Sequence, residues 1–396
     1  MCDRMVTCCV SWCREVREIN KFDAYDGMCL AGGLVFFAPV ALLVRTQAGV
    51  SERQFFLLQA LLSGIVAVCE IPTGRLTDRI GYRNSLIVSQ SLLLTARLLL
   101  TAAFLARSLP LFVLEAVAEG LAACFASGTD SAYLYARYGE EAYLVKSAHA
   151  ANFGTAGFLL STAAYAALYR FFSLKGLLFA TVLSGATGLL FSVFLRREPP
   201  QARRRERARL AKLLCDRRAL LFTALLAAFS VAWLLINFFY VEKLQDCGIP
   251  LGWMTAVIFV YSAVQMLAEP IIRLLKRRRA THLTVRFGLL SGVALLLFGR
   301  LRAAWLVLPF MAVLPLLLDL ASFHLEEQQN RLVDALRIGS DRATALSVMN
   351  VGVSLVETLS LFASSLLVAV GASWCFCLCG VLLILGAIGI FYQKSV

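Results

Sequence analysis

Twelve long apolar stretches constrain this chain more than any other feature of its sequence. An α-helix needs about 20 apolar residues to cross the hydrocarbon core of a bilayer. Between charged breaks, stretches of this kind lie at residues 24–44, 54–73, 85–106, 110–134, 150–170, 174–195, 219–241, 251–272, 283–299, 304–324, 343–369 and 372–391. The short alternating segments of a membrane β-barrel are absent from the sequence. We therefore predict an all-α integral membrane protein with 12 transmembrane helices.

Composition supports this class and excludes others. The chain is 60% hydrophobic and 16% charged, whereas a soluble chain is about 45–50% apolar and about 25% charged. Polar groups could not cover so much apolar surface in a soluble protein of this length. The sequence therefore argues against a soluble enzyme, a nucleic-acid-binding protein and a secreted disulfide scaffold. We expect a lipid bilayer as partner, and no nucleic acid.

The net charge of +13 becomes informative once it is sorted by segment. With the N-terminus inside, inner segments hold 29 Lys and Arg residues and outer loops hold 8, while Arg97 lies within a span. An excess of basic residues marks the cytoplasmic side of a membrane protein. We predict a multi-pass protein of the plasma (inner) membrane with both termini in the cytoplasm.

Ten of these basic residues lie in one loop, residues 196–218, which divides the chain into halves of similar length. Duplicated bundles of this kind are typical of secondary transporters. We expect a monomer with a cytoplasmic tail (1–20), a six-helix bundle (21–195), a basic cytoplasmic linker (196–218), a second six-helix bundle (219–391) and a C-terminal tail (392–396).

The loop after the second span carries a motif. It reads Glu-Ile-Pro-Thr-Gly-Arg-Leu-Thr-Asp-Arg-Ile-Gly-Tyr-Arg over residues 70–83. This resembles the signature loop of the major facilitator superfamily, G-x-L-a-D-r-x-G-r-k, in sequence and in place. The matching positions are Gly74, Leu76, Asp78, Arg79, Gly81 and Arg83. The resemblance, to the bacterial 12-helix type, implies two pseudo-symmetric six-helix bundles that transport by alternating access.

The resemblance also implies a cytoplasmic gate, in which Asp78 docks against the start of the eleventh helix. That start reads Gly-Ser-Asp-Arg-Ala over residues 339–343, where Ser340 or Asp341 is a candidate N-cap. Asp130, in a Ser-Gly-Thr-Asp segment that resembles a motif of some bacterial facilitators, extends the gate. The alternative is that these charges only set topology. The predicted gate residues are Gly74, Asp78, Arg79, Gly81, Arg83, Asp130 and Arg342.

Two family patterns are incomplete. Proton-coupled members often carry R-x-x-q-G in the fourth span, and here Glu119 stands in the Gln position and Ala116 in the Arg position. The antiporter pattern G-P-x-x-G-G of the fifth span is absent, since residues 150–165 contain no proline. These departures weaken the specific case for drug–proton antiport.

Ionisable residues inside the spans are costly and therefore indicate function. The predicted residues of the proton-coupling site and substrate cavity are Glu119, Arg97, Glu357, Asp319 and Glu115. At about 1.5 Å per residue, Arg97 and Glu119 lie at the same depth in a core about 30 Å thick. We predict that they form an ion pair, either permanently as a static pair or in one transport state only.

Glu357 and Asp319 have no obvious basic partner in their own or the preceding span. Such a carboxyl group suits a proton carrier, and equally a contact for a cationic substrate. At the outer end of the seventh span, Asn237, Phe238 and Tyr240 are candidates for an outer gate, although aromatic residues at that depth also form interfacial belts.

The sequence therefore predicts a secondary active transporter of a small organic molecule, most simply a proton-coupled exporter of amphipathic or cationic compounds. A proton-coupled uptake symporter of a metabolite is the alternative, and a non-transporting membrane sensor with the same fold ranks below both. A Walker A loop and hydrolase motifs are absent, so we expect no enzymatic activity. We also expect no cofactor and no metal.

Overall fold

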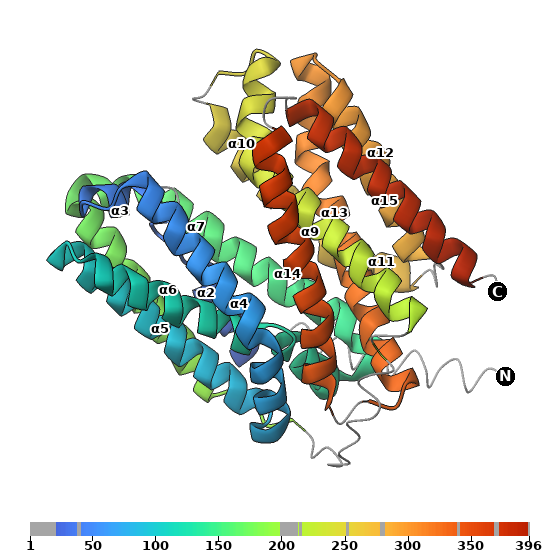
Figure 1. Ribbon diagram of the computed structural model, residues 1–396, viewed down its shortest axis with the longest axis horizontal. Helices are drawn as coiled ribbons and strands as arrows, with labels where there is room; N and C mark the ends of the chain where they lie inside the picture. The colour runs from blue at the N-terminus through green and yellow to red at the C-terminus, as the bar shows by residue number, and fades with distance from the viewer. Residues whose placement is uncertain are drawn as a thin grey trace. The chain divides into compact units, whose positions relative to one another are not determined.

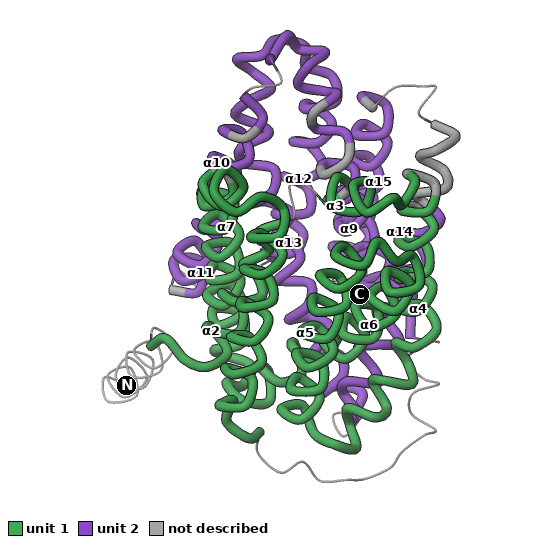
Figure 2. Tube along the Cα trace, turned by 90° about the vertical axis from the view of Figure 1, so that its left-hand side faces the viewer, with its two compact units in different colours: residues 1–201 green, residues 202–396 purple. Residues whose placement is uncertain are grey.

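The computed structural model describes residues 21–37, 41–198, 213, 216–250, 253–277, 282–338, 341–367 and 372–394. These residues form helices and contain no strand. The chain divides into two compact units, Met1–Gln201 (unit 1) and Ala202–Val396 (unit 2) (Figure 2). The division falls within the predicted linker 196–218, most of which lies outside the described residues. An all-α membrane fold is confirmed.

Unit 1 contains six helices in the described residues (Figure 1). They are α2 (Ala24–Gly33), α3 (Ala41–Gln47), α4 (Glu52–Ile80), α5 (Tyr82–Ala106), α6 (Leu109–Ala126) and α7 (Thr129–Val193). Helix α7 is interrupted twice, at Gly139 (φ 74°) and at Ser173 (φ 58°). Its three pieces therefore correspond to the end of the fourth predicted span and to the fifth and sixth spans.

Unit 2 contains seven helices in the described residues. They are α9 (Arg217–Asp246), α10 (Met254–Gln265), α11 (Ala268–Arg277), α12 (Leu283–Arg300), α13 (Ala304–Ala335), α14 (Arg342–Leu367) and α15 (Ala372–Lys394). The eighth predicted span is divided between α10 and α11. The ninth span, the shortest of the twelve predicted, is helix α12.

Nine helical stretches among the described residues are long and apolar enough to cross a membrane. One of them, Leu109–Tyr165, contains both the fourth and the fifth predicted spans. The first predicted span is not among the nine, because it is broken between α2 and α3. The eleventh is also not among them, so the count of twelve stays a prediction.

Side-chain caps define where several helices begin. Asp23 accepts hydrogen bonds from the first free N–H groups of α2, and Asp26 bonds back to the Asp23 N–H in a capping box. Ser51 and Gln54 form the same arrangement at the start of α4. Asp216 caps α9. These caps satisfy N–H groups that a helix leaves without partners in its first turn.

The same order of helix packing occurs in both units. In unit 1, α5 packs on α6 and α7, and α4 packs on α6. In unit 2, α12 packs on α13 and α15, and α10 packs on α13. In each unit, the third span therefore contacts the fourth and the sixth, and the second span contacts the fourth. This repetition is expected for two pseudo-symmetric bundles.

Glycines permit the closest of these contacts. A Cβ atom on Gly33 would lie 2.0 Å from the Gly154 carbonyl oxygen, and one on Gly157 would lie 2.2 Å from that of Leu30. Helices α2 and α7 therefore meet backbone to backbone. Small residues at helix contacts are typical of membrane bundles, because they let the backbones approach.

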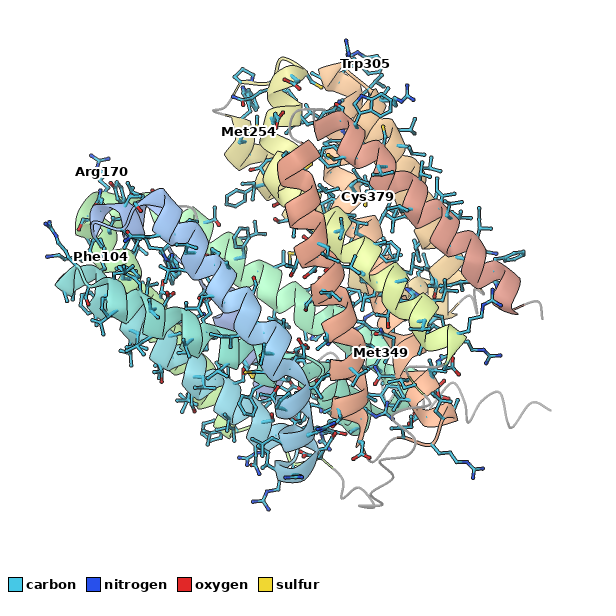
Figure 3. The ribbon with its side chains drawn as sticks, in the orientation of Figure 1. Phe104, Arg170, Met254, Trp305, Met349 and Cys379 are labelled. Atoms are coloured by element: carbon cyan, nitrogen blue, oxygen red, sulfur yellow. The ribbon has the colours of Figure 1, made fainter. Side chains whose placement is uncertain are left out.

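Large apolar side chains are exposed on both units. Leu57, Phe171 and Trp305 are examples, and Figure 3 shows Trp305 projecting from unit 2. Contiguous exposed apolar surface is rare on soluble proteins. These side chains instead match a lipid environment, where they need no cover.

Candidate transport site

Arg45 on α3 is a buried cation that pairs with a predicted site residue. Its Nη2 lies 3.0 Å from Glu115 Oε1 on α6, and neither side chain is more than 4% exposed. The guanidinium also lies 5.4 Å from the ring centroid of Phe55 and 5.9 Å from that of Phe112. A buried ion pair of this kind is destabilising once one partner is lost. Arg45 follows directly after the first predicted span (24–44), and the structure places its side chain inside unit 1.

Glu119 lies one helical turn from Glu115 on the same face of α6, and the two carboxyl groups are within hydrogen-bonding reach. Such a hydrogen bond needs a proton on one of the two groups, because two ionised carboxylates this close repel each other strongly. Arg45 already neutralises Glu115. Glu115 therefore has a cation on one side and a second carboxyl group on the other.

Arg97 on α5 is buried, but its direct partners are neutral. Nη1 donates to Ser184 Oγ at 2.9 Å and to the Thr181 carbonyl at 3.3 Å, and Nη2 reaches the Gly32 carbonyl at 3.5 Å. Across the described residues, Arg97 has no ion pair within 4.0 Å.

The predicted Arg97–Glu119 ion pair is therefore absent from this structure, and a permanent static pair is wrong. The physical reason is that carbonyl and hydroxyl oxygens from α2 and α7 already satisfy the guanidinium. Glu119 still acts on Arg97 through its charge, so depth estimation correctly placed the two groups near each other. A pair that forms in one transport state only stays a prediction.

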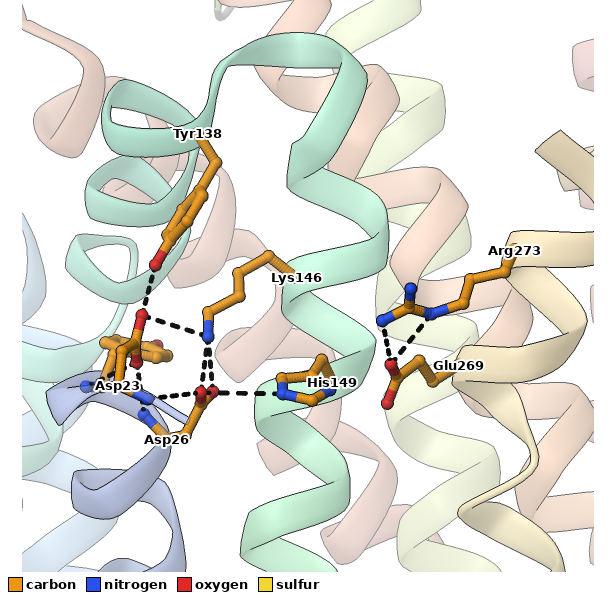
Figure 4. A network of polar contacts seen from close by, with 8 residues as sticks. Asp23, Asp26, Tyr138, Lys146, His149, Glu269 and Arg273 are labelled. Atoms are coloured by element: carbon orange, nitrogen blue, oxygen red, sulfur yellow. Dashed lines mark hydrogen bonds and ion pairs between the residues drawn. The ribbon is translucent and has the colours of Figure 1, made fainter. Parts of the chain in front are cut away.

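A second buried cation, Lys146 on α7, lies at the start of α2 (Figure 4). Its Nζ lies 2.7 Å from both carboxylate oxygens of Asp26 and 3.2 Å from Asp23 Oδ2. Lys146 and Asp26 are both fully buried. His149 Nε2 is 3.7 Å from Asp26 Oδ2, one turn further along α7. Lys146 lies between the fourth and fifth predicted spans (110–134 and 150–170), and the structure places its side chain in the core of unit 1.

Tyrosines complete this network. The Tyr138 hydroxyl donates to Asp23, and the Tyr25 hydroxyl donates to Asp130 Oδ1 at 2.9 Å. Burial acts to raise the pKa of Asp23, but the hydrogen bonds from Tyr138 and the Asp26 N–H, with the charge of Lys146, outweigh it. The pKa of Asp23 therefore lies below its ordinary value. Asp130, a predicted gate residue, is thus tied to the start of α2.

The signature loop is held by its neighbours in unit 1. Helix α4 ends at Ile80, and Gly81 adopts φ 91° before α5 begins. The Glu198 carboxylate accepts from the N–H groups of Tyr82 at 2.6 Å and Arg83 at 3.2 Å. A carboxylate at this position stabilises the start of a helix.

Arg83 in turn donates to the carbonyls of Leu195 and Val193 at the end of α7. It therefore binds the last turn of the sixth span. Gly74 is buried within α4, Asp78 is half-buried, and Arg79 is exposed in the last turn of that helix. The predicted contact of Asp78 with the eleventh helix would join the two units and stays a prediction.

Arg342, the remaining predicted gate residue, stands at the start of α14. Its guanidinium donates to Asn330 Oδ1 at 2.9 Å and forms an ion pair with Asp334, both on α13. Ser340, one candidate N-cap, lies outside the described residues, while Asp341 directly precedes the helix. Arg342 therefore fixes the connection between the tenth and eleventh spans within unit 2.

The two predicted carboxylates of unit 2 have neutral partners. Glu357 on α14 accepts a hydrogen bond from the Ser230 hydroxyl on α9. Asp319 on α13 accepts from Gln265 Nε2 on α10 at 2.6 Å, and Trp233 on α9 also hydrogen-bonds to it. Within the described part of unit 2, neither carboxylate has an ion pair within 4.0 Å. The role of these two carboxylates in a substrate cavity stays a prediction.

Unit 2 also contains a buried lysine that the sequence does not predict to be buried. Lys243 near the end of α9 donates to the Gly299 carbonyl and to Ser373 Oγ, each at 3.0 Å. Lys243 is 2% exposed, although it lies in sequence between the seventh and eighth predicted spans. The lysine joins the end of α12 to the start of α15, where a cation is favourable at a helix C-terminus.

The proposed outer gate is described only in part. The side chains of Asn237 and Phe238 lie outside the described ones, while Tyr240 is half-buried on α9. Metal sites need several convergent His, Cys, Asp or Glu ligands. A search of the described residues finds no group of three or more such side chains placed to hold an ion.

Comparisons with known proteins identify the family. The model of the Major Facilitator Superfamily matches residues 27–324. No curated protein matches the chain in sequence.

Among solved structures, the E. coli fucose:proton symporter is similar with a TM-score of 0.72 and 14% identity, over 92% of this chain and 96% of the symporter. The human organic anion transporter TETRAN is similar with a TM-score of 0.68 and 17% identity, over 95% of this chain and 98% of the transporter. At these identities the likeness shows the fold alone. With the family match over most of its length and the signature loop at residues 70–83, the chain belongs to the major facilitator superfamily.

Proposed function

We propose that this protein is a secondary active transporter that couples the movement of a small organic molecule to protons. Members of the family transport small molecules across a bilayer, and the two units carry the buried ionisable groups that coupling requires. In this proposal the two units alternate access to a substrate near the membrane midplane. The family does not work by enzymatic chemistry, and the described groups are suited to binding and proton transfer.

The observation that carries the proposal is the carboxyl pair of α6. Glu115 and Glu119 are within hydrogen-bonding reach, and Arg45 compensates only Glu115. In this proposal the two carboxyl groups share one proton and release it when their surroundings change. Coupled carboxyl groups titrate as a pair rather than singly. A shared proton in the middle of a span is what a proton-coupled transporter needs.

Unit 2 offers a place for the substrate. Glu357 and Asp319 bind Ser230 and Gln265, so either carboxylate can receive a proton or a cation without breaking an ion pair. Trp233 beside Asp319 adds an aromatic face, and aromatic faces attract organic cations. Amphipathic or cationic compounds are therefore the substrate class that we propose.

We propose export as the direction of transport. Two of the similar structures are a fucose:proton symporter and an organic anion transporter, so the same fold serves different substrates. Proton-coupled uptake of a metabolite is the alternative that the same carboxyl pair would serve. Both alternatives use the carboxyl pair of α6 for proton coupling, so the substrate and the direction of transport are separate questions from coupling.

The gate residues retain their proposed role. Asp78, with Arg79, Gly74 and Gly81, would close the cytoplasmic side against the eleventh helix, while Arg83 holds the loop to α7. Tyr240 would contribute to the outer closure together with Asn237 and Phe238. Closure on alternate sides by rocking of two bundles is the general mode of such transporters.

Transport assays on purified protein in lipid vesicles test the function. Thermal shift with ethidium, an amphipathic cation, and with L-fucose first shows which compound stabilises the fold. Counterflow of the stabilising compound, with protein-free vesicles as control, then separates a transporter from a sensor. We expect counterflow, and we expect an imposed pH gradient to drive net movement. Binding without counterflow would indicate a sensor, and counterflow indifferent to the gradient would indicate facilitated diffusion.

A further inference from the structure

Carboxylate oxygens enclose the ammonium group of Lys146 at the start of the first span (Figure 4). Nζ lies 2.7 Å from Oδ1 and from Oδ2 of Asp26, and 3.2 Å from Oδ2 of Asp23. The ring centroid of Tyr138 lies 5.5 Å from the same nitrogen. An ammonium group has three N–H donors, so its donors and these oxygen acceptors match in number. The side chains of Lys146 and Asp26 are fully buried, which keeps the ammonium group away from bulk water.

The first turn of α2, and not the lysine, positions the two carboxylates. Asp23 Oδ1 accepts hydrogen bonds from the N–H groups of Tyr25 and Asp26, at 2.9 Å and 3.0 Å. In return, Asp26 Oδ2 accepts from the Asp23 N–H at 3.1 Å, which completes a capping box. Lys146 reaches Asp26 from α7, 120 residues further along the chain. The carboxylates therefore keep their places when the lysine side chain is shortened.

The two carboxylates differ in what compensates their charge. Asp23 accepts from the Tyr138 hydroxyl and from N–H groups at the positive end of α2. Asp26 is fully buried and bonds the ammonium through both of its oxygens, while His149 Nε2 is further away, at 3.7 Å. A buried carboxylate that lacks a cation is strongly destabilising. The fold therefore requires one positive charge beside Asp26.

Carboxylate oxygens also bind small hard cations from solution. Ion-coupled transporters hold such cations near helix ends in their spans. In this chain the cation is instead part of α7, and a tethered group binds with the advantage of an intramolecular contact. A dissolved cation therefore does not displace it.

We propose that the start of the first span is a site for a small monovalent cation and that Lys146 fills it permanently. The tethered ammonium group takes the place of the dissolved cation that Asp26 and Asp23 would otherwise bind. Transport by this protein then requires neither Na⁺ nor K⁺. The inference rests on the proposed function, because it states which cations the coupled transport does without.

Chemical rescue of Lys146→Ala tests the site in the full-length protein, purified in detergent. The variant keeps both carboxylates and leaves a space where the ammonium group and its stem were. Melting temperatures are compared in the chlorides of ethylammonium, sodium and choline at equal ionic strength, at about pH 8.5, where imidazole in water is neutral. Choline is bulky and has no N–H donor.

We expect Lys146→Ala to melt about 3–5 °C higher in ethylammonium or sodium chloride than in choline chloride. A shift of this size corresponds to a cation at about tenfold its dissociation constant. A rise in ethylammonium chloride alone would assign the site to cations with N–H donors. The melting temperature of the wild-type protein should differ by less than about 1 °C among the three salts, because its site is already filled.

Two variants are matched controls. Lys243→Ala also removes a buried lysine, but that lysine bonds a carbonyl and a hydroxyl only, so we expect no rise specific to one salt. Lys146→Ala/Asp26→Asn removes the charge that requires the cation. Its dependence on the salt should disappear, and it should melt higher in choline chloride than Lys146→Ala does.

Equal melting temperatures of Lys146→Ala in all three salts would overturn the inference, as would the same rise in Lys243→Ala. Failure of Lys146→Ala to fold in any of the salts, while Lys146→Ala/Asp26→Asn folds, would also overturn it, because the carboxylates then take up no dissolved cation. A wild-type protein that sodium chloride stabilises over choline chloride would overturn it without any variant.

Transport in vesicles separates this inference from the proposed function. Wild-type counterflow, and its response to a pH gradient, should be equal in sodium and choline salts, and this comparison decides the matter if neither Lys146 variant folds. Transport that requires Na⁺ but still follows the pH gradient would overturn the inference and leave the proposed function intact. Rescue of Lys146→Ala as expected, with transport indifferent to the pH gradient, would do the reverse.

Discussion

Buried charged groups have different kinds of partner in the two units. In unit 1, Lys146 and Arg45 each meet a buried carboxylate, at 2.7 Å and 3.0 Å. In unit 2, the carboxylates of Glu357 and Asp319 meet neutral donors, and Lys243 meets a carbonyl and a hydroxyl. Ion pairs in unit 2 occur instead at the ends of its helices, for example between Arg342 and Asp334.

This difference separates structural charges from exchangeable ones. A buried ion pair cannot lose one member cheaply, because the remaining charge is left without compensation. A carboxylate with a neutral donor changes its protonation or its ligand at the cost of one hydrogen bond. Unit 1 therefore holds its buried cations Arg45 and Lys146 in ion pairs, whereas the carboxylates of Glu357 and Asp319 in unit 2 are bound by neutral donors.

The largest effect that we expect is a difference in stability between variants of the two buried lysines. Lys146→Met would leave Asp26 buried and unpaired, and we expect a loss of about 3–5 kcal/mol in the free energy of unfolding. Lys243→Met removes bonds to neutral acceptors only, so we expect a loss of about 1–3 kcal/mol. Denaturant titration in detergent measures both. Equal losses would remove the distinction between the units.

The Arg45–Glu115 pair allows a double-mutant cycle. Arg45→Met or Glu115→Leu alone should each cost about 3 kcal/mol or more, because each leaves a buried charge. The double variant should be more stable than either single variant, with a coupling energy of about 1–3 kcal/mol. Additive losses would mean that the buried pair does not act as a unit.

In unit 2, we expect substitution of the buried carboxylates to impair transport while changing the free energy of unfolding only slightly. Glu357→Gln and Asp319→Asn keep a group that can bond Ser230 or Gln265, so unfolding should change by about 1 kcal/mol or less. Substrate counterflow or its response to a pH gradient should nevertheless be lost. The control is Glu242→Gln, which should retain both. Full transport by the double variant Glu357→Gln/Asp319→Asn would exclude these carboxylates from the site.

The smallest effect concerns Asp23, which is partly exposed. Its pKa is lowered in the folded protein, so the ionised group stabilises the fold fully above the ordinary Asp pKa of 3.8, and this stability is lost as the pH falls through the folded value. Asp23→Asn should therefore reduce the fall in melting temperature that the wild-type protein shows at acidic pH. Near neutral pH, the dependence of melting temperature on pH should change less. An unchanged acid limb would contradict the network in Figure 4.

Much of the fold could be predicted because apolar length and charge distribution decide it. The apolar stretches gave most of the helices, and the basic linker gave the division into halves. The break in the first span could not be predicted from hydropathy, because a hydropathy average depends only on composition and carries no information about backbone conformation. Gly32, Gly33 and Pro39 in one apolar stretch are the signal that could have indicated it.

The candidate site was predicted only in part. The estimated depths in the membrane predict that Arg97 lies near Glu119. They do not predict which acceptors the guanidinium binds, because the long arginine side chain can reach several. The sequence places three other buried cations outside the predicted spans, namely Arg45, Lys146 and Lys243. A cation at a span end can also turn inward when a carboxylate or a helix C-terminus lies at the same depth, and only the tertiary packing shows this.

The most direct test of the account is substrate-driven proton movement in vesicles that contain a pH-sensitive dye. The substrate is whichever of ethidium or L-fucose stabilises the protein, added as a gradient without an imposed pH difference. The account predicts that wild-type protein moves protons with the substrate, and that Glu119→Gln still exchanges substrate in counterflow but moves no protons. Proton movement that persists in Glu119→Gln would contradict the central claim that proton coupling requires Glu119 in the carboxyl pair of α6.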